Sequence, residues 1–294
     1  MASVSAILKQ VKRRLHLKNC LVRECLAEFL GTFLVIFIGG AAVAQVQTTS
    51  KGAYLSINIG YGVGVMFGIY AAGGVSGAHL NPAISICFCV LGKLPWWKLP
   101  FYILSQTFGA FVGAAVIFTM YYDSIMHFTG GELIADGATL ATGGIFATYP
   151  AVYLTTRNGF IDQVVATAVL LLVILSLNDS RNNEPPAFLK PILIGTLVLV
   201  IGVAMGSNCG YAINPARDFG PRLFSYLVGY GSQVFTAGDS WWWVPIVAPV
   251  LGGLLGCFLY KILIEIHHDD PEEHSQQPAA DLELPTIDSS SREQ

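Results

Sequence analysis

The chain has 294 residues, of which 53% are hydrophobic and only 12% are charged, and its formal net charge at pH 7 is −3. Soluble globular domains carry about 25% charged residues, so this composition excludes an ordinary soluble fold and favours a membrane protein. The charge gives no reason to expect a nucleic-acid partner, because no basic patch is predicted on a folded surface.

The N-terminal segment, residues 1–20, is predicted to be a basic cytoplasmic extension. Its cations are Lys9, Lys12, Arg13, Arg14 and Lys18. The first apolar run begins near Cys25, is too long for the apolar region of a signal peptide, and lacks a clear small-residue cleavage site. We interpret this run as the first membrane-spanning helix of a domain that covers residues 21–266.

Several apolar segments are long enough to cross a bilayer core, which needs about 20 helical residues. The six segments are 25–45, 55–72, 100–122, 161–178, 190–206 and 243–265. Two further apolar stretches, 81–91 and 214–228, are too short to span and too apolar for ordinary loops, since eleven helical residues rise only about 16 Å. The sequence therefore predicts an all-α membrane protein with six transmembrane helices and two re-entrant half-helices.

The lysines and arginines set the predicted orientation. With the N-terminus inside, twelve of them fall on the cytoplasmic side, and the outside receives only Lys51, Arg157, Arg217 and Arg222. This bias predicts that both termini are cytoplasmic. The acidic and polar segment 267–294 has few apolar residues and is predicted to be a disordered cytoplasmic tail.

The chain repeats one motif in its two halves, about 21–122 and 160–266. Each half has two spans, then an Asn-Pro-Ala triplet, then a third span; the triplets are Asn81, Pro82, Ala83 and Asn214, Pro215, Ala216. Three spans per half is an odd number, so the two halves are predicted to lie in opposite senses across the membrane. Such inverted repeats build their shared site near the midplane from broken helices.

Each Asn-Pro-Ala triplet is a good helix start. The asparagine caps the helix, and proline at the first helical position loses no needed donor. We expect the side-chain amides of Asn81 and Asn214 to remain free as donors that face a pore. Both half-helices would direct the positive ends of their dipoles at that point, which opposes cations and interrupts proton relay along water.

The residues before each asparagine are expected to run extended and to present carbonyl oxygens to the pore. These residues are Gly77, Ala78, His79, Asn208, Cys209 and Gly210. The side chain of Cys209 is also expected beside the pore lining. Irregular backbone at membrane depth is tolerated only where it is buried in protein or lines a water-filled cavity, which favours this interpretation.

These motifs resemble the aquaporin family over about residues 20–266. The matching stretches are Ala27-Glu28-Phe29-Leu30-Gly31-Thr32, Ser76-Gly77-Ala78-His79-Leu80-Asn81-Pro82-Ala83 and Asn214-Pro215-Ala216-Arg217-Asp218. Within the family the chain is similar to the aquaglyceroporin subgroup, vertebrate types 3, 7, 9 and 10. The resemblance implies a multi-pass plasma-membrane channel, a homotetramer in the lipid bilayer, that passes water, glycerol and urea and has no cofactor.

The resemblance also implies the residues of the narrowest part of the pore, which are Tyr61, Gly202, Tyr211 and Arg217. Strict water channels of the family have histidine at the position of Gly202, so its absence is expected to widen this ring. A glycerol molecule could then lay its carbon edge on the two tyrosines and its hydroxyls on Arg217. Asp218, directly after the arginine, is another mark of the glycerol-conducting subgroup.

Two polar residues in the spans are expected to support the re-entrant loops. Glu28 lies in the first span, and Gln163 stands in the fourth span where many family members have glutamate. A neutral amide can still accept a backbone N–H bond. A buried ion pair of Arg217 with Asp218 or Glu28 is the alternative to its position in the pore.

Other functions remain as alternatives at this point. A strict water channel is one, and an inverted-repeat secondary transporter is another, although it would need an acidic coupling residue, for which Glu28 and Asp162 are the candidates. The sequence shows no Ser-His-Asp set, metal-ligand cluster or phosphate loop, so neither an enzyme nor a metal site is expected.

Overall fold

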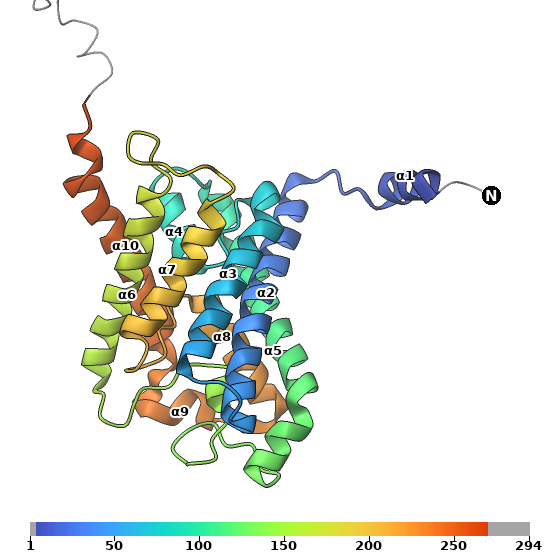
Figure 1. Ribbon diagram of the computed structural model, residues 1–294, viewed down its shortest axis with the longest axis vertical. Helices are drawn as coiled ribbons and strands as arrows, with labels where there is room; N and C mark the ends of the chain where they lie inside the picture. The colour runs from blue at the N-terminus through green and yellow to red at the C-terminus, as the bar shows by residue number, and fades with distance from the viewer. Residues whose placement is uncertain (1–3, 270–294) are drawn as a thin grey trace, which may run out of the picture.

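The computed structural model describes residues 4–269, in which the regular structure is helical (Figure 1). The long helices are α2 (Cys20–Thr49), α3 (Tyr54–Ser76), α5 (Leu99–Thr129), α6 (Thr156–Ser176), α7 (Lys190–Met205) and α10 (Val244–Leu263). The shorter ones are α1 (Val4–Leu15), α4 (Pro82–Val90), α8 (Pro215–Ser225), α9 (Gln233–Ser240), η1 (Trp96–Lys98), η2 (Gly143–Ile145), the π-helical η3 (Tyr226–Tyr230), η4 (Trp241–Trp243) and η5 (Glu265–His267).

The predicted spans correspond to helices in the structure, with different ends. Within residues 4–269, five helices are long and apolar enough to cross a membrane, and α7 is an apolar helix of 16 residues. The α5 helix continues to Thr129, seven residues beyond its predicted end. The second half-helix is shorter than predicted because α8 ends at Ser225 and a π-helical turn follows.

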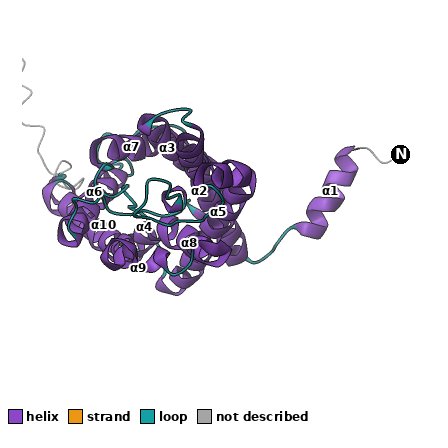
Figure 2. Cartoon of the chain, turned by 90° about the horizontal axis from the view of Figure 1, so that it is seen from below, coloured by secondary structure: helices purple, strands orange, loops and turns teal. Residues whose placement is uncertain are grey.

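The short helix of each half packs against a long helix of the other half. The α2 helix packs against α3 and α5, and α6 packs against α10. The α4 helix of the first half packs on α10 of the second, whereas α8 of the second half packs on α5 of the first. Seen along the bundle, the long helices surround the loops that lead into α4 and α8 (Figure 2). This is the arrangement that the inverted repeat predicts.

Close backbone contact inside each half depends on glycine. A Cβ atom on Gly109 of α5 would lie 2.3 Å from the Phe29 carbonyl oxygen of α2. In the other half, a Cβ on Gly252 of α10 would lie 2.3 Å from the Val164 oxygen of α6. Small residues at such crossings let membrane helices approach through dispersion contacts, which drive their association in lipid.

Both ends of the described chain leave the bundle at the same end (Figure 1). At this end Lys98 pairs with Glu24 at 2.8 Å and Arg181 pairs with Glu265 at 3.5 Å. Lys98 and Arg181 therefore lie at the same end of the bundle as the termini. Within the basic N-terminal segment 1–20, residues 4–15 form α1. Most of the predicted tail, 270–294, lies outside the described residues.

The last described turn of the chain is fastened to the loop between α6 and α7. His268 Nε2 lies 3.1 Å from Asp179 Oδ2, and the Tyr260 hydroxyl donates to the same oxygen at 2.9 Å. Burial acts to raise the pKa of Asp179. Hydrogen bonds from the Arg181 backbone N–H, Tyr260 and His268 outweigh it and lower the pKa overall.

Candidate functional site

The loops before the two half-helices have the same backbone conformation at positions 133 residues apart. Asn81 and Asn214 are extended N-cap residues whose side-chain oxygens accept from the N–H of Ala83 and of Ala216. Non-glycine residues with positive φ precede both, at Ala78, Leu80, Tyr211 and Ile213. An L-residue in this conformation costs about 1–2 kcal/mol of conformational free energy. Other contacts must therefore hold the loops in place.

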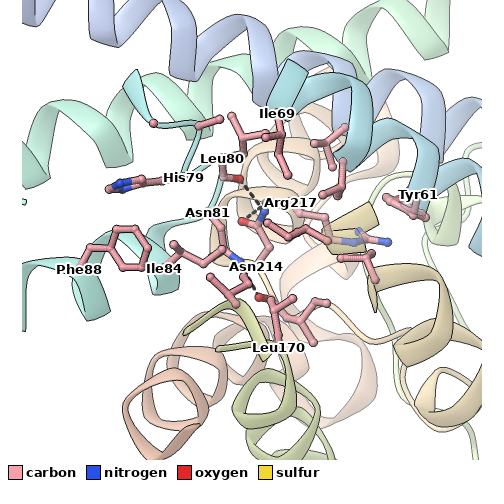
Figure 3. A pocket seen from close by; sticks show the side chains of 18 of the residues that line it. Tyr61, Ile69, His79, Leu80, Asn81, Ile84, Phe88, Leu170, Asn214 and Arg217 are labelled. Carbon is pink, nitrogen blue, oxygen red and sulfur yellow. Dashed lines mark hydrogen bonds between the residues drawn. The ribbon is translucent and has the colours of Figure 1, made fainter. Parts of the chain in front are cut away.

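The two asparagines hold each other's loops. Asn81 Nδ2 donates to the Ile213 carbonyl at 2.8 Å, and Asn214 Nδ2 donates to the Leu80 carbonyl at 2.8 Å. Figure 3 shows the two asparagines next to each other, with Leu80 beside them. The expectation that both amides are entirely free is wrong. Each NH₂ group has two hydrogens, and one of them links the halves while the other remains for the cavity.

Glu28 supports the first loop from the interior of α2. Its side chain is fully buried, and its oxygens accept from the backbone N–H of His79 at 2.9 Å and of Leu80 at 2.7 Å. They also accept from the Ser76 hydroxyl at 2.6 Å and from Gln106 Nε2 at 2.8 Å. All four partners are donors, so both oxygens are used and Glu28 does not border the cavities.

Gln163 occupies the corresponding place in the second half. Its Oε1 accepts from the Ile213 backbone N–H at 3.1 Å, and its Nε2 lies 3.1 Å from Cys209 Sγ. The amide therefore contributes one backbone bond where Glu28 contributes two. The Cys209 thiol is buried against Trp241 and Val244, away from the cavities, so its predicted place beside the pore lining is wrong.

Carbonyl oxygens line the cavity in both loops, but the second set differs from the prediction. Among residues 4–269, no donor bonds to the oxygens of Gly77, Ala78 and His79, which line the inner cavity described below. The corresponding unbonded oxygens of the second loop belong to Gly210, Tyr211 and Ala212.

Asn208 and Cys209 do not contribute to this set. The Asn208 oxygen accepts from the Ala151 N–H at 2.8 Å, and neither residue lines a cavity. The predicted series was placed two residues too early in the chain. Counting 133 residues from Gly77 to His79 leads instead to 210–212.

Two cavities of about 380 Å³ each meet inside the bundle. The inner cavity, bordered by Asn81 and Asn214, is lined by both polar groups and aliphatic side chains. The aliphatic side chains include Val35, Val65, Ile69, Leu170, Ile174, Ile194 and Val198. The outer cavity lies toward the loop 130–155. Three residues, Tyr61, Tyr211 and Arg217, border both cavities, so the passage between them runs past these side chains.

The three shared residues form a compact group. The rings of Tyr61 and Tyr211 meet edge to face with centroids 6.1 Å apart, and the Arg217 guanidinium carbon lies 4.8 Å from the Tyr61 centroid. One guanidinium N–H donates to the Phe146 carbonyl at 3.4 Å. Arg217 borders both cavities, so its remaining donors face the passage. The alternative ion pair of Arg217 with Asp218 or Glu28 does not form.

Asp218 has a different partner, which the sequence did not indicate. It is fully buried and pairs with the equally buried Arg222 at 2.8 Å. The other oxygen of Asp218 accepts from the Thr148 N–H and hydroxyl at 2.7 and 2.6 Å. This network attaches the loop 130–155, including Phe146, to α8. Arg222, which the topology assigns to the outside, is a buried cation of this network beside the loop 130–155.

Gly202 lies behind Tyr211 and does not border either cavity. A Cβ atom there would lie 2.5 Å from Asn58 Oδ1 and 2.6 Å from Tyr211 Cζ. The Tyr211 hydroxyl donates to Asn58 Oδ1 at 2.7 Å. The missing side chain therefore makes room for the tyrosine ring and does not widen the passage directly. Asn58, fully buried in α3, is a positioning residue that sequence reasoning missed.

We expect Gly202→Ala to push Tyr211 into the passage and to break its bond with Asn58. Glycerol flux into proteoliposomes should fall several-fold more than water flux, because the larger solute is more sensitive to the ring position. Val203→Ala, at a neighbouring side chain that is 53% exposed on the outer face of α7, is the control. An unchanged ratio of glycerol to water flux in Gly202→Ala would contradict this role.

Comparisons with known proteins agree with this geometry. Residues 16–260 match the family model for the major intrinsic protein family. Human aquaporin-9 is 48% identical over 95% of this chain and 97% of its own length, and human aquaporin-10 is 44% identical over 94% of each. The X-ray structure of the aquaglyceroporin from Plasmodium falciparum has a TM-score of 0.76 at 34% identity, and covers 84% of this chain and 98% of that one.

Proposed function

The chain belongs to the major intrinsic protein family, that of the aquaporins, and we propose that it is a passive channel for water, glycerol and other small neutral solutes. The fold class expected from the sequence, the aquaporin fold, is confirmed by the family match and the structural neighbour. One observation carries the substrate proposal: two cavities that meet at Tyr61, Tyr211 and Arg217.

The passage is lined by both polar and apolar groups, which suits glycerol. The hydroxyl groups of a polyol can bond to the free carbonyls of the two loops and to Arg217, while its carbon edge lies on Tyr61, Tyr211 and the aliphatic residues. A solute that exchanges its hydration for these groups loses few hydrogen bonds on entry. Urea offers the same small, neutral, hydrogen-bonding surface, and we include it among the solutes.

Ions are excluded by three positive features around the passage. The α4 and α8 helices both begin at the asparagines, so the positive ends of their dipoles face the inner cavity. Arg217 adds a full charge at the constriction. The free N–H of each asparagine can bond to the oxygen of one water and orient it, which interrupts proton relay.

Coupled transport is not supported by the acidic residues of the membrane spans. The two acidic candidates, Glu28 and Asp162, border neither cavity. Glu28 is occupied by four donors, and Asp162 accepts from Asn208 and Cys209. A carboxylate that binds and releases a coupling ion must reach the transport path, and these two do not.

The wider setting of the channel is also part of the proposal. We place it in the plasma membrane as a homotetramer with both termini cytoplasmic, residues 1–20 and 267–294 being the cytoplasmic extensions of a channel domain at 21–266. The exposed apolar side chains on the outer helix faces suit contact with lipid and neighbouring subunits, among them Leu104, Phe108 and Phe258.

Swelling of proteoliposomes tests the proposed function directly. Vesicles with the protein should take up both water and glycerol much faster than empty vesicles, and urea should follow, because all three fit the same passage. Rapid water flux together with glycerol uptake no faster than in empty vesicles would instead indicate a strict water channel. Equal rates in filled and empty vesicles for every solute would rule out a channel.

Asn178-Asp179-Ser180 tests the proposed orientation, since it is the only N-glycosylation triplet in the chain. It lies between α6 and α7, where Asn178 bonds to Ile174 O at 2.7 Å and to Lys190 Nζ at 3.1 Å. With this loop in the cytoplasm, we expect no mobility shift on N-glycosidase treatment of protein from eukaryotic cells. A glycan on Asn178 would show that this loop lies outside the cell and would contradict the proposed orientation.

A matched control places an acceptor at the opposite end of the bundle. Gly137→Asn creates the triplet Asn-Ala-Thr in an exposed part of the loop 130–155, where φ is +81° and no atom lies within 4 Å of the new Cβ. Asparagine tolerates this backbone conformation better than most residues. This variant should be glycosylated, and a variant without a glycan would contradict an outside location for the loop.

A further inference from the structure

The α1 helix stands clear of the channel bundle. Figures 1 and 2 both show it beyond the long helices, and in Figure 1 it runs sideways from the end of α2 and not along it. Four residues, 16–19, connect the two helices. Four extended residues reach about 14 Å at most, so α1 stays close to the level at which α2 leaves the membrane.

The helix has two chemically different faces. Leu8, Val11 and Leu15 recur at the i, i+3, i+7 spacing that places residues on one side of a helix. Their exposed fractions are 62%, 44% and 72%, so the bundle does not cover this side. Exposed cations surround this side, with Lys9 and Arg13 opposite it and Lys12 and Arg14 along its two edges.

The charge around this helix has a single sign. The first acidic residue of the chain is Glu24, which already belongs to α2, whereas Lys18 and Arg23 add to the cations before it. A helix of 12 residues is marginally stable alone in water. It needs a partner that takes up aliphatic side chains and attracts positive charge at the same time.

We propose that α1 lies in the membrane interface and binds anionic lipid headgroups. Its aliphatic side would insert between the upper acyl chains, while the lysines and arginines contact phosphate and carboxylate groups. Two observations favour lipid over a protein partner. The connection to α2 keeps the helix at a membrane surface in every copy of the chain, and the cations lie beside the aliphatic face, as in interfacial helices.

Hydrogen exchange of the full-length protein in nanodiscs tests this binding. The amides of residues 4–15 should exchange about tenfold or more slowly when phosphatidylserine is mixed into phosphatidylcholine than in phosphatidylcholine alone. High salt should remove most of the difference, since headgroup charges are screened. A variant with glutamine at all four cationic positions, Lys9, Lys12, Arg13 and Arg14, should also lose the difference between the two lipids. A control variant that keeps the charge, with arginine at the two lysine positions and lysine at the two arginine positions, should retain the difference.

The apolar face provides a second set of variants. Leu8→Ser, Val11→Ser and Leu15→Ser together should abolish protection in both lipids, whereas Gln10→Ser should leave most of it. Glycerol uptake should be unchanged in every variant, because α1 lies outside the cavities. The proposal is overturned if protection of α1 is independent of phosphatidylserine. It is equally overturned if the triple serine variant remains protected, which would identify a protein surface as the partner.

Discussion

Glu28→Ala is expected to destabilise the channel strongly and to lower the yield of folded protein. Three buried donors and the part-buried Ser76 hydroxyl would lose their acceptor, and two of the buried donors are the backbone N–H groups of His79 and Leu80 in the first loop. Leaving buried polar groups unpaired costs about 1–3 kcal/mol each, so a combined loss of about 3 kcal/mol or more follows. The measurement is the yield of monodisperse protein in detergent and its melting temperature, which should fall by roughly 10 °C.

Two variants separate this role from a general effect of changing a glutamate. Glu28→Gln retains one acceptor oxygen and should be damaged less than the alanine variant. Glu24→Gln changes a carboxyl one turn earlier on α2, which accepts from the partly exposed Lys98 and from Tyr102, and it should cost less than Glu28→Ala because no backbone N–H loses its acceptor. If Glu28→Ala melts at the same temperature as the parent, the loop does not depend on this carboxyl.

Arg217→Met is expected to make the channel leak cations and protons while it still conducts glycerol. At 5 Å and an effective dielectric constant of 20, one charge raises the energy of a passing cation by about 3 kcal/mol, or roughly a hundredfold in rate. Folding should survive, because the guanidinium makes one bond of 3.4 Å and a contact with Tyr61. A pH-sensitive dye inside proteoliposomes would report the leak.

The control for this variant is another arginine. Arg157, exposed at the start of α6, lies outside both cavities, and Arg157→Met should leave the leak unchanged. Glycerol uptake measured on the same vesicles shows that the variant is folded. A tight channel in Arg217→Met with normal glycerol uptake would mean that the helix dipoles alone exclude ions.

The local features of the site could be predicted because their physics is local. A helix that begins with Asn-Pro is capped by its own sequence, and the repetition of this start at Asn81 and Asn214 indicates the inverted repeat. The register of the second loop was missed because residues 208–210 were paired with 77–79, whereas the 133-residue offset identifies Gly210, Tyr211 and Ala212.

Contacts between distant residues carry no such local signal. Asn58 meets Tyr211 across 153 positions of sequence, and the role of Gly202 depends on that pair. The partner of Asp218 was similarly hidden, although Arg222 lies four residues later on the same helix face. For α1, the spacing of Leu8, Val11 and Leu15 was a usable signal, but the run of cations favoured a solvated extension.

The crossed bonds of Asn81 and Asn214 also set an order for biogenesis. The donor that completes the first loop, Asn214, is synthesised 134 residues after Leu80, so the Leu80 carbonyl remains unpaired while the ribosome continues. At the usual rates of synthesis this interval is roughly 7 to 27 seconds. During that time the first three spans hold an unfinished loop, open to water or to the translocation machinery. An N-terminal half expressed alone would remain in that state, and the C-terminal half supplied on a separate chain would complete it.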